Sequence, residues 1–173
     1  MLESWLVSHL AAGTAPGQIR TELDSMRRLQ GGRLPEGMQI ALSRWDDALR
    51  RWEAETHQPR PTTAADALQR GRTRYLEAKG LSAIGRSYDA TVLFLWAREW
   101  LDRSIDLEGA TQHLPETLYL LGEIFVTLRR AMPKQFHGDQ LLNVCSDLFP
   151  SSIWASRANA AWQTSMIEPE GSR

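Results

Sequence analysis

The chain is poor in residues that form crosslinks or carry out chemistry. Cys145 is the only cysteine among 173 residues, so no internal disulfide can form, and no metal-ligand spacing surrounds it. The four histidines are scattered, and the chain has no HExxH motif, nucleophile elbow or glycine-rich phosphate loop. We therefore expect no metal, no cofactor and no small-molecule substrate. An enzyme with a spatially assembled site is the least favoured class of function.

Long apolar runs and excess charge are also absent. No stretch of about 18 apolar residues occurs, which predicts that nothing spans a membrane. The first five residues lack the basic and apolar regions of a signal peptide. The cytoplasm is the expected compartment, with a mature exported protein whose leader was removed as the alternative. The net charge of −1 gives no bulk attraction to nucleic acid or anionic lipid.

Helical periodicity dominates what is present. Apolar residues recur at steps of three and four, most clearly at Met38, Leu42, Trp45, Leu49 and Trp52. The pattern predicts an all-α protein. The segment 87–107 is apolar around most of its circumference, which predicts a helix buried on more than one side.

The polar segment 56–63 contains two prolines and is predicted to be a linker. It separates an N-terminal helical segment of three helices, over residues 1–55, from a helical domain over residues 64–167. Residues 168–173 are expected to form a flexible tail. Thr63, with Asp66 three residues later, predicts the N-cap of the first helix after the linker.

Three helical segments of the later region carry small residues at positions that suit close helical hairpins. A first helix, predicted over residues 115–131, is followed by a second over 139–148 that ends at Pro150. The motifs are Leu118-x-x-Leu121-Gly122-x-x-Phe125, then Gly138-x-x-x-Leu142-x-x-Cys145, and earlier Ala90-x-x-x-Phe94-x-x-Ala97. They resemble the hairpin of tetratricopeptide (TPR) repeats, over residues 66–165 at most.

The resemblance implies helical hairpins stacked as a short TPR-like superhelix, preceded by the three N-terminal helices. A helical bundle or another solenoid is the alternative. It also implies a non-enzymatic module that binds a protein, as an adaptor, a chaperone or a subunit of a larger assembly. Cys145 takes the place of a small packing residue in this pattern, and we interpret it as such rather than as a reactive thiol.

The groove of such repeats is lined mainly by the first helix of each hairpin. Tyr75 and Tyr119 occupy matching places in two segments that are weakly similar at a step of 44 residues. Leu76 and Leu120 follow them on the same face. The residues predicted to bind the partner are Arg72, Tyr75, Lys79, Tyr119, Glu123 and Thr127. The alternative is that the tyrosine rings are buried and only the charges face solvent.

A second interpretation concerns residues 10–23, which resemble the turn of a helix-turn-helix. It would make the protein a nucleic-acid-associated regulator. The second helix would then offer Gln18, Arg20, Thr21, Arg27 and Arg28. Two acidic residues, Glu22 and Asp24, share that helix, and a short helical hairpin explains the same pattern.

Overall fold

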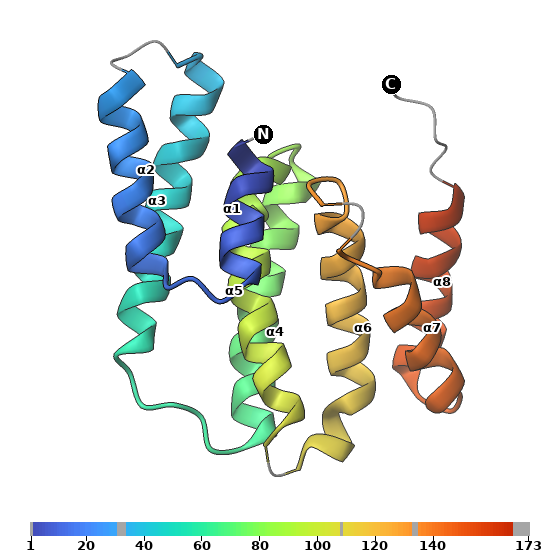
Figure 1. Cartoon of the computed structure of the whole chain (residues 1–173). Helices are drawn as coiled ribbons and strands as arrows, with labels where there is room; N and C mark the ends of the chain where they lie inside the picture. Colours follow the sequence, from blue (N-terminus) through green and yellow to red (C-terminus); the bar gives the residue numbers. More distant parts are fainter. Residues whose placement is uncertain (1, 31–33, 108, 133–134, 168–173) are drawn as a thin grey trace. The chain divides into compact units, whose positions relative to one another are not determined.

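A computed structural model describes residues 2–30, 34–107, 109–132 and 135–167. Within these ranges the chain forms eight helices and no strand (Figure 1), which confirms the all-α prediction. The helices are α1 (Leu2–Ala11), α2 (Pro16–Gln30), α3 (Glu36–Thr56), α4 (Ala64–Ala83), α5 (Ser87–Ile105), α6 (Ala110–Leu128), α7 (Gly138–Leu148) and α8 (Ile153–Ile167). The predicted tail, 168–173, lies outside the described residues.

Helices α1 and α4 end in the same way, at a glycine with a positive φ. Gly13 (φ 86°) and Gly85 (φ 76°) adopt the left-handed conformation that other residues rarely take. At Gly85, the Arg86 N–H donates to the Leu81 carbonyl, and the Gly85 N–H donates to the Ser82 carbonyl. This is the Schellman pattern, which satisfies the last carbonyls of a helix and turns the chain away.

Two helix starts are fixed by hydroxyl side chains. The Asp66 N–H donates to Thr63 Oγ1 at 3.3 Å, so the predicted N-cap of α4 is confirmed. At α8, the Ala155 N–H donates to Ser152 Oγ at 3.0 Å. Each bond satisfies a backbone donor that the first turn of a helix leaves without a partner.

The predicted starts of α6 and α7 were wrong. Helix α6 begins at Ala110, five residues before the predicted Pro115, and contains that proline. The prediction took the proline as the first helical residue, where its missing N–H has no cost, but the helix accommodates it one turn later. Helix α7 begins at Gly138, one residue before its predicted start, so Asp139 lies in the first turn.

The chain divides into two compact units. Unit 1 comprises Met1–Arg60 and Arg74–Trp96, and unit 2 comprises Pro61–Thr73 and Ala97–Arg173. Helices α4 and α5 therefore contribute residues to both units. The predicted division at residues 56–63 stays a prediction. Residues 57–63 contain no helix, as a linker requires.

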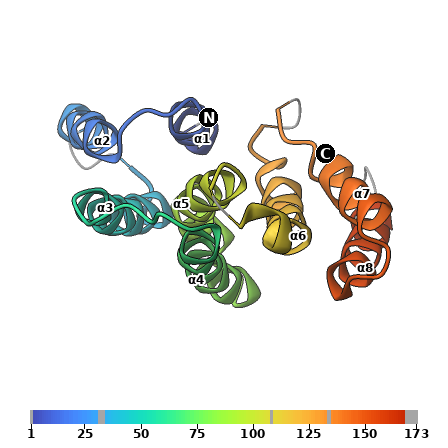
Figure 2. The same ribbon diagram turned by 90° about the horizontal axis from the view of Figure 1, so that it is seen from below.

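In unit 1, the apolar stripe of α3 forms much of the core. Leu42, Trp45, Leu49 and Trp52 are buried, whereas Met38 at the start of the stripe is partly exposed. The Trp45 indole N–H donates to the carbonyl of Tyr88 at 2.7 Å. Helices α2 and α3 form an antiparallel pair, side by side in both views (Figures 1 and 2), and α1 packs on α2.

In unit 2, helices α6, α7 and α8 pack on one another in sequence, and α8 also contacts α6. Leu118, Leu142, Cys145 and Ala158 form a buried cluster, covered partly by Trp154 and other apolar side chains. The N-terminal part of α4 meets the C-terminal part of α5 through Gly71, beside Leu101. The described helices thus pack as adjacent pairs.

The segment 87–107 is confirmed as a helix buried on several sides. Nine apolar residues of α5 are buried, and they cover most of its circumference. They are Ala90, Val92, Leu93, Phe94, Leu95, Trp96, Ala97, Trp100 and Leu101.

Candidate functional site

Helices α6 and α7 approach each other closely at two glycines of the repeat-like motif. A methyl group added at Gly138 would overlap the backbone carbonyl of Gly122 and the backbone N of Val126. One added at Gly122 would come within 2.7 Å of the Leu142 side chain and 3.2 Å of the Gly138 carbonyl. The two motifs therefore meet at their small residues, as a close helical hairpin requires.

Cys145 is a packing residue, as predicted. Its side chain is fully buried, and its thiol donates a hydrogen bond to the Pro115 carbonyl at 3.2 Å. Burial raises the pKa of the Cys145 thiol above its ordinary value. Because the thiolate is the reactive form, this site suppresses nucleophilic chemistry.

Four of the six predicted partner-binding residues belong to unit 2. Arg72 makes a two-pronged ion pair with the buried Glu116, with both nitrogen–oxygen distances 2.6 Å. Tyr119 is half-buried, and its ring lies 5.4 Å from that of Trp154. Glu123 and Thr127 are also half-buried on α6, one turn apart. Arg72 therefore has a structural role, which leaves little of its guanidinium for a partner.

Tyr75 and Lys79 belong to unit 1 and differ in exposure. The Tyr75 ring is buried, and its centre lies 6.2 Å from the centre of the Phe94 ring. This matches the alternative of a core tyrosine. Lys79 is exposed, and its Nζ lies 5.7 Å from the centre of the Tyr75 ring. Leu76, beside them, is 58% exposed. In unit 1 the predicted face therefore offers Leu76 and Lys79 to a partner, but not the tyrosine ring.

Unit 1 contains a charged and aromatic cluster that the sequence did not predict. Arg51 donates two hydrogen bonds to the Glu77 carboxylate, at 2.6 and 2.9 Å. These bonds lower the pKa of Glu77 and raise that of Arg51. The Arg74 guanidinium carbon lies 3.9 Å from the centre of the Trp96 ring, which stacks on Trp52 at 6.1 Å. The cluster ties α3 to α4 and α5, and so has a structural role.

Several residues of the helix-turn-helix interpretation bond to other groups of the same unit. Arg20 Nε lies 3.0 Å from Asp46, and its Nη1 lies 2.7 Å from Glu53, both on α3. The hydrogen bonds to Asp46 and Glu53 raise the pKa of Arg20. The Gln18 amide donates to Glu22, and the Thr21 hydroxyl donates to the Gly17 carbonyl. The α2 face that carries Arg20 is thus used for packing on α3.

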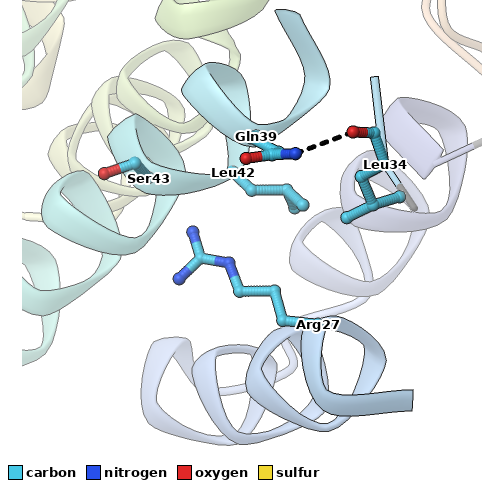
Figure 3. Close-up of a pocket in the computed structure, with 5 residues that line it drawn as sticks. All are labelled: Arg27, Leu34, Gln39, Leu42 and Ser43. Carbon is cyan, nitrogen blue, oxygen red and sulfur yellow. Dashed lines mark hydrogen bonds between the residues drawn. The ribbon is translucent and has the colours of Figure 1, made fainter. Parts of the chain in front are cut away.

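A cavity of about 290 Å³ opens between α2 and α3 (Figure 3). Arg27 reaches into it from α2, and Leu42 closes it from α3. Gln39 and Leu34 lie at one end, where the Gln39 amide N–H donates to the Leu34 carbonyl at 2.7 Å. Ser43 completes the lining. No sequence motif marked this cavity.

The described ranges of the chain lack the features of two other kinds of site. They contain no group of three or more His, Cys, Asp or Glu side chains that could hold a metal ion. Nor do they contain a helix with the length and apolarity needed to cross a bilayer. Comparison of the chain with protein-family models, curated proteins and solved structures gave no match. Function must therefore be argued from the molecule itself.

Proposed function

We propose that the protein is a non-enzymatic module of TPR-like helical hairpins that binds another protein. Two features support this. The described helices pack as adjacent pairs, and the α6–α7 pair meets at Gly122 and Gly138, the small residues of the repeat-like motif. Scaffolds of this kind present helix faces to their partners instead of assembling a reactive centre.

The observation that carries the proposal is an apolar face on the C-terminal half of α4, in unit 1. Leu76 is 58% exposed, and Ile84, at the end of the helix, is 66% exposed. Leu76 and Gly80 are one turn apart on one side of α4, and Ile84 is the first residue after the helix, four residues beyond Gly80. Exposed apolar residues aligned in this way are typical of interaction surfaces, whereas single exposed leucines are ordinary. We call these three residues the α4 face.

Gly80 strengthens the argument because the fold itself does not need a glycine there. A methyl group at Gly80 would meet no described atom within 4 Å. Glycine within a helix costs about 1 kcal/mol relative to alanine. Gly71, in the same helix, is explained by its contact with Leu101, but Gly80 has no such contact. A partner helix that approaches the α4 backbone closely would account for it.

Lys79 lies beside the α4 face and adds a charge to it. A partner helix with an apolar stripe flanked by a carboxylate would complement this combination. Reversing the charge with Lys79→Glu should therefore weaken binding while leaving the fold intact, because exposed positions tolerate substitution.

The test compares two double variants in affinity purification from the native source, followed by mass spectrometry. Leu76→Glu with Ile84→Glu places charges on the α4 face. The matched control, Leu148→Glu with Ile153→Glu, changes residues of α7 and α8 that are exposed to a similar extent, 63% and 64%. Circular dichroism establishes that both variants are folded.

We expect proteins that are recovered with the wild type and with the control to be lost with the α4 variant. Recovery of the same proteins with all three would remove the α4 face as the binding surface. Loss with both variants would show that general surface hydrophobicity, and not the α4 face, holds the recovered proteins.

A further inference from the structure

The described residues that line the cavity between α2 and α3 include a cation, Arg27, and two leucines. Arg27 supplies a planar guanidinium, whose five N–H donors suit the two oxygens of a carboxylate. Leu34 and Leu42 supply the apolar wall. Figure 3 shows the Arg27 side chain extending from α2 into the space below Leu42.

The guanidinium is weakly engaged by its own chain. Within the described part of the chain, its ion-pair partner is Asp24, with Arg27 Nη1 3.8 Å from Asp24 Oδ1. Both belong to α2, three residues apart, and such exposed pairs contribute little to stability. By contrast, Arg20, two turns earlier on α2, makes ion pairs at 2.7 and 3.0 Å with α3. Arg27 thus keeps donors for a ligand where Arg20 does not.

The polar groups around Arg27 limit what can bind. The Gln39 amide nitrogen is committed to the Leu34 carbonyl, so its oxygen remains as an acceptor. Ser43 also lines the cavity, but its hydroxyl oxygen points away from Arg27 and Leu42 (Figure 3). The volume of about 290 Å³ is near the lower end of small-molecule sites, roughly 300–1,000 Å³.

We infer that this cavity binds a short aliphatic carboxylate, with the carboxylate on Arg27 and the alkyl group against Leu34 and Leu42. The site shares no residue with the α4 face, so it does not depend on the proposed protein-binding function. A purely anionic ligand such as phosphate would satisfy Arg27 but would offer no alkyl group to Leu34 and Leu42. A neutral ligand would add no negative charge beside the guanidinium beyond its long pair with Asp24.

The experiment is a titration followed by ¹H–¹⁵N NMR of the uniformly labelled full chain. The probe is 4-methylpentanoate, and the comparison ligands are its neutral amide and inorganic phosphate. The reporters are the side-chain amide of Gln39 and the backbone amides of Leu42 and Ser43. We expect saturable shifts at these signals with the carboxylate, and affinities at least about tenfold lower for both comparison ligands.

Arg27→Gln should weaken binding of 4-methylpentanoate by about tenfold or more, because it removes the guanidinium that would bind the carboxylate. Arg28→Gln is the matched control. Arg28 is the next residue of α2, is exposed, and donates to a backbone carbonyl of its own helix. The rest of each spectrum shows whether the variant is folded, and the ligand comparison on the wild type stands without any variant.

Three results would overturn the inference. One is the absence of saturable shifts with 4-methylpentanoate. Another is an affinity for the amide or for phosphate equal to that for 4-methylpentanoate. Equal affinity for the amide would show that Arg27 does not bind the carboxylate, and equal affinity for phosphate would show that the leucines do not bind the alkyl group. The third is unchanged affinity in folded Arg27→Gln, or an equal loss in Arg28→Gln, which would place the ligand elsewhere.

Discussion

Replacing Gly138 with alanine should destabilise the protein, although alanine is the better helix former. The new methyl group would overlap the Gly122 carbonyl and the Val126 backbone nitrogen of α6. Backbone atoms cannot rotate away as a side chain can, so the two helices must separate. Overpacking of this kind costs about 1–3 kcal/mol, and contact with backbone favours the upper part of that range, about 2–3 kcal/mol.

Gly80→Ala is the matched control and should change stability in the opposite direction. Its methyl group would meet open space, so the substitution removes the helix cost of glycine, about 1 kcal/mol, and adds no clash. For a chain of this length, 1 kcal/mol corresponds to about 2–4 °C in melting temperature. We therefore expect Gly138→Ala to lower Tm by about 4–12 °C and Gly80→Ala to raise it by about 2–4 °C.

The assay is thermal unfolding followed by circular dichroism at 222 nm, with wild type and both variants in the same buffer. The decisive result is that Tm changes in opposite directions in the two variants, since this does not depend on the exact magnitude of either change. A Gly138→Ala protein as stable as the wild type would refute the close α6–α7 approach. A destabilised Gly80→Ala protein would show that this glycine is already packed against something within the chain.

Three further predictions concern the side chains of the two units. Cys145 should resist thiol reagents in the folded protein and react once the chain is unfolded, because burial removes both access and thiolate character. Hydrogen bonds from Arg51 hold the pKa of Glu77 below its unfolded value, so their contribution to stability is present above about pH 4.3 and is lost as the pH falls through the folded pKa. Glu77→Gln should accordingly make Tm less sensitive to acidification below that pH. Arg72→Gln should lower the free energy of unfolding, measured by urea titration, by about 1–3 kcal/mol, because the buried Glu116 carboxylate loses its charged partner. A loss below about 0.5 kcal/mol would mean that water takes the place of the Arg72 guanidinium beside Glu116.

Local patterns predicted most of the helices. The stripe from Leu42 to Trp52 is buried because helical periodicity alone places those residues on one side. The Thr63 cap needs information from only three residues. The small-residue motifs also identified Gly122 and Gly138 correctly as residues of a close helix contact. A close hairpin requires small residues at a regular spacing, and that spacing is visible in the sequence of each helix separately.

Partners distant in sequence could not be predicted. Arg51 and Glu77 are 26 residues apart, and Arg72 and Glu116 are 44 apart, so no spacing rule connects them. The same limit applies to Gly71 and Gly80. Both glycines lie within α4, but a methyl group at Gly71 would meet Leu101, whereas one at Gly80 would meet no described atom within 4 Å. Which side of α4 is covered depends on its neighbours, and the helix sequence alone does not contain that information.

The unequal surroundings of Leu76 and Leu120 decide where a partner is best sought. The two leucines match at a step of 44 residues, and a strictly repeated scaffold would present them alike. Leu76 is largely exposed on α4, whereas Leu120 is buried on α6. Exposed apolar area can drive association only where it is still in contact with water before binding. For this reason the proposed function depends on the α4 face, and matching substitutions at Leu120 would report on folding instead of binding.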